Sequence, residues 1–259
     1  MILDRLTEEI LELGSMKKYP PNLFFRGNKN LLTKRKISIV GTRKPSKYSR
    51  ELTHRLASLL SKRDVCVVSG GAMGIDAVAH LGAGCSNTIA VLPCGVDIKY
   101  PAVNKNLLTD IEQNGLLLSQ FDNNFKATPW SFVVRNELVV ALGDVLVVAE
   151  AELDSGSMRS VEFALKMKKD IYVFPQRLGE SSGTNKLLDD TKAKAIYDIE
   201  KFCDMFSGVE SKNIKLDKFQ DFCKTNPTYE ETLKKFPDKI FEAELSGEIM
   251  VKNGLVYLL

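Results

Sequence analysis

The sequence has little of what a metal site or a nucleophilic active site requires. Its 259 residues include two histidines and five cysteines, with no CxxC pair and no metal-type spacing between them. A zinc site is therefore not expected, and the chain has no GxSxG motif or other nucleophile–base arrangement. We expect no metal, no cofactor and no catalytic residue, and we expect the cysteines to be buried, inert thiols in a reducing compartment.

Long apolar segments are also missing. No run approaches the ~20 residues that a membrane-spanning helix needs, and the first residues, MILDRLTEEILELG, carry acids where a signal peptide has an apolar core. We therefore expect no membrane partner and a cytoplasmic location. Apolar residues one helical turn apart predict a short amphipathic helix in this stretch and a helical lead-in over residues 1–35. Its apolar face would hold Ile2, Leu6, Ile10 and Leu13.

The net charge of +3 is small, but it is unevenly distributed. Residues 1–63 hold 15 Lys and Arg against 5 Asp and Glu, whereas residues 211–259 hold 8 of each sign. A basic segment in a chain that is otherwise acidic or neutral favours an anionic partner bound on one face. A solvated lysine-rich surface would give the same counts, and charge alone does not separate the two.

Residues 36–207 alternate short β-branched runs with longer segments of helical period. The runs are Ile37–Val40, Val65–Val68, Thr88–Leu92, Leu116–Ser119, Val145–Ala149 and Ile171–Phe174. Most are apolar on both faces, as strands covered by helices on either side are. This pattern predicts an α/β fold with a Rossmann-like, doubly wound and mostly parallel sheet.

The end of the chain predicts a second, smaller domain. Residues 208–215 are weakly patterned and read as a linker, and residues 216–259 contain three short helical signals followed by two apolar runs around Asn253-Gly254. Asn-Gly between apolar runs is a strong hairpin signal, so the order predicts a winged-helix-like domain. Its helix after Pro237 carries Glu242 and Glu244 against a single Lys239, so we expect it to add little DNA affinity and to contact proteins.

The stretch VVSGGAMGID predicts a strand that ends in a glycine-rich turn before a helix. Unpaired amides at a helix N-terminus suit a phosphate, and glycine lets a ligand approach the backbone. The candidate binding residues of this turn are Ser69, Gly70, Gly71, Ala72 and Gly74. The spacing is neither GxGxxG nor that of a phosphate-binding Walker loop, and a tight turn needed only for packing is the alternative.

Two further loops are expected at the same edge of the sheet, because the carboxyl ends of parallel strands lie together. After the first strand come Arg43 and Lys44, which could contact phosphates or belong to an ordinary surface loop. After the fifth run come Ser155 and Ser157, which suit helix caps first and ligand groups second.

An apolar helix near residues 130–143 carries polar side chains in its middle. A buried unpaired arginine costs several kcal/mol, so Arg135 requires either a carboxylate within the fold or a ligand. Asn136 follows it, and Trp130 and Phe132 lie near the start of the helix. These aromatic side chains could stack on bases or belong to the core.

Several motifs occur together in a fixed order. They are Tyr19-Pro20, Leu23-Phe24-Phe25-Arg26-Gly27, Val40-Gly41-Thr42-Arg43, Ser69-Gly70-Gly71-Ala72-x-Gly74-Ile75-Asp76, Phe132-x-x-Arg135-Asn136, Ser155-Gly156-Ser157 and Gly183-Thr184-Asn185. In this respect the chain resembles the DNA-processing protein A (DprA/Smf) family of bacteria over about residues 19–206.

The resemblance implies a homodimeric protein without catalysis that binds single-stranded DNA and delivers it to RecA recombinase during natural transformation. It implies that Arg43 contacts phosphate, that the Ser69–Gly74 turn supplies amides, and that Phe132 stacks on a base beside Arg135 and Asn136. Some relatives have a lysine just before the Phe-x-x-Arg-Asn motif, where this chain has Pro129-Trp130.

Two other functions stay open. A phosphoribohydrolase that acts on nucleoside monophosphates, of the Lonely guy type, would need a catalytic glutamate, for which Glu162 is the candidate. A protein-interaction adaptor would keep the fold with a vestigial pocket.

Overall fold

A computed structural model describes residues 4–207, 218–223, 225–245, 249–252 and 254–258. The chain divides into two compact units, residues 1–208 and 209–259.

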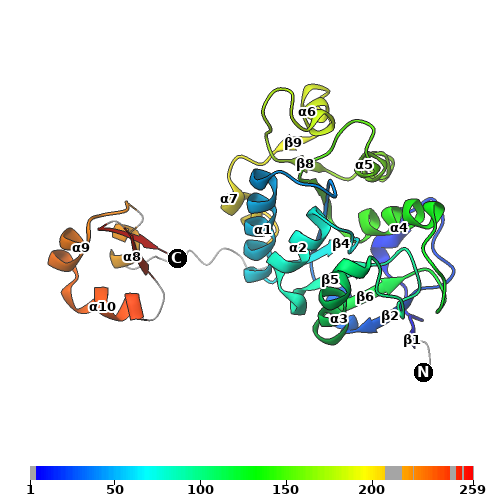
Figure 1. The fold of residues 1–259 in the computed structure, drawn as a ribbon, viewed down its shortest axis with the longest axis horizontal. Coiled ribbons are helices and arrows are strands. Elements are labelled where there is room, and N and C mark those ends of the chain that lie inside the picture. Colours follow the sequence, from blue (N-terminus) through cyan, green and yellow to red (C-terminus); the bar gives the residue numbers. More distant parts are fainter. Residues whose placement is uncertain (1–3, 208–217, 224, 246–248, 253, 259) are drawn as a thin grey trace. The chain divides into compact units, whose positions relative to one another are not determined.

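The first unit is built on one nine-stranded sheet (Figure 1). Its strand order is β1-β2-β6-β5-β4-β3-β7-β8-β9, and neighbours are parallel from β6 to β9 and antiparallel from β1 to β6. The strands are β1 (Asp4–Arg5), β2 (Phe24–Gly27), β3 (Lys36–Val40), β4 (Cys66–Ser69), β5 (Thr88–Val91), β6 (Leu116–Ser119), β7 (Val145–Val148), β8 (Ile171–Val173) and β9 (Lys194–Ala195).

Helices cover both faces of this sheet (Figure 1). They are α1 (Lys47–Lys62), α2 (Ile75–Ala83), α3 (Lys105–Asn114), α4 (Pro129–Leu142), α5 (Gly156–Lys166), α6 (Ser182–Asp189) and α7 (Ile199–Asp204). The buried clusters place α1, α2, α3 and α7 on one face and α4, α5 and α6 on the other. No helix in the described part of the chain is long and apolar enough to cross a membrane.

The predicted α/β class and mostly parallel sheet are confirmed. All six apolar runs form strands, and every residue of β3 through β8 is buried. The one polar side chain in the middle of β3, Ser38, donates its hydroxyl to the Val139 carbonyl of α4 at 2.6 Å. Burial of a strand on both faces is therefore compatible with polar groups only where a partner lies in reach.

The N-terminal segment differs from the predicted helical lead-in. Its described residues form β1, two 3-10 turns over Leu11–Ser15 and Lys29–Thr33, and the antiparallel strand β2 beside β6. Ile10 and Leu13 are buried as expected, but Ile10 lies just before the 3-10 turn Leu11–Ser15 and Leu13 lies within it. The segment before this turn is extended, and the Leu6 amide donates to the Leu23 carbonyl at 2.8 Å. Ladder pairing with the edge of the sheet replaces the isolated helix, which is too short to be stable alone.

The second unit has three short helices followed by a hairpin. They are α8 (Lys218–Cys223), α9 (Tyr229–Lys235) and α10 (Pro237–Leu245), with β10 (Ile249–Lys252) pairing antiparallel with β11 (Leu255–Leu258). Phe219, Ile240, Ile249 and Val256 belong to its buried core. This element order agrees with the predicted one, while the winged-helix assignment stays a prediction. The predicted linker at residues 208–215 lies outside the described residues.

His80, for which the sequence suggests no role, lies wholly inside the first unit. Its Nδ1 is 2.7 Å from Thr88 Oγ1, and the Thr88 hydroxyl donates to the Val67 carbonyl, so Nδ1 must carry the proton that bonds Thr88. His80 Nε2 is buried and has no partner among the described residues. Burial lowers the pKa of this imidazole from 6.5 to about 3.

This histidine predicts a loss of stability on acidification. The folded unit keeps His80 neutral below pH 6.5, while the unfolded chain takes up a proton there, so stability falls as pH drops from the unfolded pKa towards the folded one. Well below pH 6.5, each pH unit lowers the free energy of unfolding by about 1.4 kcal/mol. Between about pH 7 and about pH 5, where only part of this slope applies, the loss is about 2 kcal/mol. Urea unfolding followed by the fluorescence of Trp130, the one tryptophan, measures it. The His80→Gln variant, which does not titrate, should show a smaller pH dependence, and parallel curves for the two proteins would contradict this prediction.

Candidate nucleic-acid interface

The predicted loops meet in one cleft at the carboxyl edge of the sheet. The chain leaves β3 for β4 on one side and returns to β7 on the other, which makes β3/β7 the switch point where α/β proteins bind ligands. A cleft of about 560 Å³ lies there. Its walls come from the loop after β3, the Ala72 turn and Asp76 of α2, the first half of α4, and the start of α5.

An aromatic ring close to two guanidinium groups marks the wall formed by α4. The Cζ atom of Arg43 lies 5.5 Å from the ring centre of Phe132, and that of Arg135 lies 5.9 Å from it. Tyr100, from the loop after β5, contacts the same ring edge-on at 5.9 Å. Phe132 is half-buried and Arg43 is exposed, so a planar, cation-flanked surface opens onto the cleft.

Arg135 pairs with a carboxylate of the fold. Its Nη1 lies 3.6 Å from Asp76 Oδ2, and the side chains of the two residues are 6% and 9% exposed. Burial raises the pKa of the Asp76 carboxyl, although the Arg135 guanidinium and the Ala72 amide lower it. Burial likewise lowers the pKa of the Arg135 guanidinium. Each charge therefore depends on the other, since neither is solvated.

The glycine turn is occupied from within the protein. The Ala72 amide donates to Asp76 Oδ2 at 3.3 Å, so a carboxylate of the fold takes the place expected for a phosphate. A Cβ atom at Gly70 would overlap Nη1 of Arg135, which explains why the backbone must be bare at this position. The turn thus binds the Asp76–Arg135 pair, and the expectation that it presents free amides to a ligand is corrected at Ala72.

Three residues of the predicted turn serve packing. Ser69 is buried and donates its hydroxyl to the Ile39 carbonyl at 2.7 Å, which ties β4 to β3. The Gly71 carbonyl accepts from Asn104 Nδ2 at 3.0 Å. Gly74 has a φ of 78°, and its bare Cα lets the turn approach the loop that carries Arg43. None of the three lines the cleft.

The start of α5 offers polar groups to the cleft. Ser155 is the N-cap residue, but its side chain makes no capping hydrogen bond, and its buried Oγ has no partner among the described residues. The expectation that Ser155 is first a cap is therefore wrong. Ser157 lines the cleft beside it, and Asn136 Nδ2 lies 3.5 Å from the Gly156 carbonyl across the gap between α4 and α5.

Most of the predicted site residues come together. Those that line the cleft are Arg43, Lys44, Ala72, Phe132, Arg135, Asn136, Ser155 and Ser157, and Gly70 lines a smaller adjoining cavity of about 30 Å³. Sequence reasoning missed Asp76, Tyr100 and Arg159. Asp76 was detectable as an acid in the first turn of a helix after a glycine turn, a place where carboxylates are favoured; Tyr100 and Arg159 gave no such local signal.

Glu162, the candidate catalytic glutamate, lies outside the cleft lining. It is exposed on α5 and its Oε1 accepts from Arg159 Nη1 at 3.0 Å. A hydrolase would need this carboxylate within hydrogen-bonding reach of the sugar. The position of Glu162 thus gives the phosphoribohydrolase reading no support.

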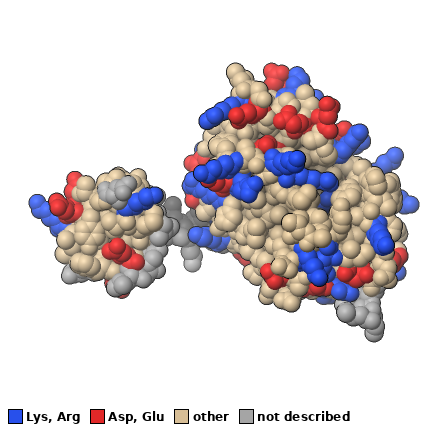
Figure 2. Space-filling model, viewed as in Figure 1, with Lys and Arg blue, Asp and Glu red and all other residues tan. Residues whose placement is uncertain are grey.

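Positive charge is gathered near the cleft. Among its lining residues, Arg43, Lys44, Arg135 and Arg159 stand against Asp76 alone. Figure 2 shows Lys and Arg side chains grouped on the visible face of the first unit near the N-terminal end of α1, which follows the Arg43 loop. A cleft lined by net positive charge attracts anions.

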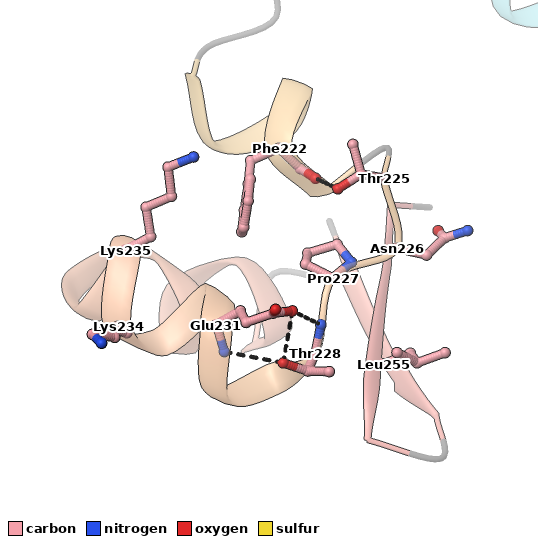
Figure 3. A pocket seen from close by; sticks show the side chains of 9 residues that line it. All are labelled: Phe222, Thr225, Asn226, Pro227, Thr228, Glu231, Lys234, Lys235 and Leu255. Atoms are coloured by element: carbon pink, nitrogen blue, oxygen red, sulfur yellow. Dashed lines mark hydrogen bonds between the residues drawn. The ribbon is translucent and has the colours of Figure 1, made fainter.

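The second unit has a pocket of its own, of about 630 Å³, between α8, α9 and β11 (Figure 3). The ammonium group of Lys235 lies 4.0 Å from the ring centre of Phe222, and Pro227 and Leu255 add apolar surface. Glu231, which also lines the pocket, is engaged in a capping box with Thr228. The lining of the pocket therefore combines apolar surface with the lysines Lys234 and Lys235.

Comparison with known proteins identifies relatives over most of the first unit. The profile of the DNA recombination-mediator protein A family matches residues 8–207. The DNA processing protein DprA of Streptococcus pneumoniae is 32% identical over 183 residues, 69% of this chain and 64% of the relative. That of Bacillus subtilis is 31% identical over 208 residues, 78% of this chain and 69% of the relative.

A solved structure is also similar. DNA processing protein A from Helicobacter pylori, described for its single-stranded DNA binding mode, has a TM-score of 0.77 and 40% identity. The match covers 78% of this chain and 94% of that one. With a family match over more than half its length and a shared fold at this identity, the chain belongs to the DNA recombination-mediator protein A family.

Proposed function

We propose that the cleft binds single-stranded DNA and that the protein protects the strand and delivers it to RecA recombinase in natural transformation. A binding role suits a family of recombination mediators, and the similar H. pylori protein is described by its single-stranded DNA binding mode. In this proposal Arg43 and Lys44 contact phosphates, and Phe132 stacks on a base.

The observation that carries the proposal is the ring of Phe132 within 6 Å of two guanidinium groups, those of Arg43 and Arg135, in a cleft at the switch point. Single strands are bound by pairing backbone cations with aromatic surfaces, and every base has a face that can stack. Arg135 is already paired with Asp76, so we assign it to positioning Phe132 and assign the phosphate contact to the exposed Arg43.

The start of α5 completes this site. The Ser155 hydroxyl, which has no partner within the described part of the chain, and the half-buried Ser157 line the cleft at a helix N-terminus. Hydroxyl donors and the partial positive charge of a helix start both favour a phosphate oxygen. We propose that Ser155 and Ser157 bind the phosphate next to the one held by Arg43.

The Arg43→Ala variant tests the proposal. Loss of a charge-assisted contact should weaken binding by about 1–3 kcal/mol, roughly 5- to 150-fold in Kd. The slope of log K against log salt should also become less steep by about 1, because one phosphate contact is gone. Anisotropy of labelled oligo-dT at several salt concentrations measures both quantities.

Arg55→Ala is the matched control for Arg43→Ala. Arg55 lies well inside α1, and its side chain is 63% exposed. The Arg55→Ala substitution therefore removes a positive charge of the same size at a place away from the cleft. Equal effects of the two substitutions would reduce the site to non-specific attraction, and a protein that binds no oligonucleotide would fit the adaptor hypothesis instead.

Homodimer formation and delivery to RecA belong to the same proposal. The second unit exposes Glu242 and Glu244 on α10, which repel phosphates, so we assign it to protein contacts. Sedimentation of the full chain would show the dimer, and faster RecA assembly on single-stranded DNA in its presence would show delivery.

A further inference from the structure

The side chain of Trp130 lies outside the cleft and outside the core. Trp130, the only tryptophan of the chain, is 62% exposed. Leaving an indole in water gives up much of the stabilisation that its burial would provide. A single exposed aromatic residue needs no explanation by itself, but this one is held in place on two sides.

The first support for Trp130 is aromatic. Its ring meets that of Phe121 at 5.7 Å with an interplanar angle of 68°, and Phe121 in turn stacks on Phe125 at 4.5 Å and 10°. Phe121 is buried. The indole is therefore fixed at one side by an edge-to-face contact, while most of its surface stays open.

The second support is the helix start. Thr128 and Ser131 form a capping box around Trp130, with the Thr128 amide donating to Ser131 Oγ at 2.9 Å and the Ser131 amide donating to Thr128 Oγ1 at 3.3 Å. Pro129 occupies the first helical position. This combination fixes the backbone of the first turn, so the indole is presented in a set direction.

The position of Trp130 connects it to the cleft. It lies one helical turn before Val133, which is 41% exposed and lines the cleft, and residues three apart are neighbours on a helix surface. Phe132, two residues further along α4, lines the same cleft as Val133. A strand that stacks on Phe132 can thus continue around the N-terminal end of α4, whose partial positive charge favours phosphate.

We infer that Trp130 is a second stacking surface, which takes a base of the same single strand just outside the cleft. The inference rests on the proposed function. A flat, rigid and exposed ring suits a nucleobase of any sequence. Stacking neutralises no phosphate, so this contact should not steepen the salt dependence of binding.

Titration of the full chain with unlabelled oligo-dT, followed by tryptophan fluorescence, tests the inference directly because Trp130 is the sole source of that signal. Stacking should quench the emission, with a midpoint equal to the Kd from anisotropy of labelled oligo-dT. Trp130→Leu should weaken binding about 5- to 150-fold, whereas Trp130→Phe should retain most of the affinity. The salt slope should stay that of the parent chain in both variants, since no phosphate contact is removed.

Leu11→Ala is the control variant. Leu11 is 84% exposed and lies beside Glu12, which pairs with Lys36 at the opposite, amino end of β3. Its substitution should leave Kd unchanged. Circular dichroism of each variant checks that the fold is intact.

The outcomes separate the two proposals. A parent chain that shows no anisotropy change overturns the proposed function itself. Binding without quenching, with Trp130→Leu equal to the parent chain, overturns the role of Trp130 and leaves the cleft in place. Weaker binding by Trp130→Leu without quenching in the parent chain, or with a changed oligomeric state, would mean that Trp130 contacts protein, which also overturns the inference.

Discussion

Substitution of Arg135 by methionine should destabilise the first unit by about 3–5 kcal/mol, because it leaves the buried carboxylate of Asp76 without its partner. The double variant Arg135→Met/Asp76→Asn should recover more than half of that loss, since an amide oxygen can still accept from Ala72 while carrying no charge. Urea unfolding of the four proteins of this cycle, at neutral pH, yields the coupling energy.

The pH dependence of the single variant has a definite sign. Burial already raises the pKa of Asp76, and Arg135 opposes that rise. Without Arg135 the pKa rises further, so protonation of the folded state relieves part of the cost, and the deficit of Arg135→Met should shrink as pH falls.

Arg159→Met provides the control for Arg135→Met. It makes the same substitution in the same cleft, but the Arg159 side chain is 61% exposed and pairs with the exposed Glu162. An exposed pair contributes about 1 kcal/mol or less. Similar losses for Arg135→Met and Arg159→Met, or a double variant no more stable than Arg135→Met alone, would contradict the assignment of a mutually dependent buried pair.

Gly74→Ala is expected to have the second-largest effect. Gly74 has a φ of 78°, and a Cβ there would lie 2.6 Å from the carbonyl carbon of Arg43 and closer still to the Thr42 carbonyl oxygen. Backbone strain of about 1–3 kcal/mol adds to a comparable cost of displacing packed backbone. The loop that must move carries Arg43, so both unfolding free energy and oligo-dT affinity should fall.

Gly84→Ala isolates the strain in this comparison. Gly84 has nearly the same φ, 74°, but nothing lies within 4 Å of its hypothetical Cβ. It should lose about 1–3 kcal/mol of stability and none of its affinity. If Gly74→Ala bound oligo-dT as tightly as Gly84→Ala, the close approach of the two loops would have no part in holding Arg43.

The sheet could be predicted because its signals are local. Strands buried on both faces read as continuous apolar runs, and β3 through β8 all follow this rule. The strand β2 was not predicted, because it is only four residues long and its partner β6 lies far along the chain. Leu6, Ile10 and Leu13 have helical spacing, but an extended segment followed by a 3-10 turn also packs them against the same core.

The sequence could predict which residues form the site better than what each residue does there. Parallel strands bring their carboxyl ends together, so the Arg43 loop, the α4 residues and the Ser155 turn were expected at one edge and line one cleft. Glycine is equally suited to contact a ligand or a neighbouring side chain, so the sequence of the turn could not reveal that Gly70 faces Arg135.

The sequence by itself determined the fold class, the positions of the loops at the carboxyl edge and the need for a partner to Arg135. These follow from hydrophobic period, from glycine and proline, and from the cost of an unpaired buried charge, which are properties of short stretches of chain. Only the tertiary structure decided that the partner is Asp76 and that Trp130 stays in water above the stacked Phe121 and Phe125. Ion pairs and the exposure of side chains depend on which strands lie side by side. No single segment of the sequence determines which distant residues become neighbours in space.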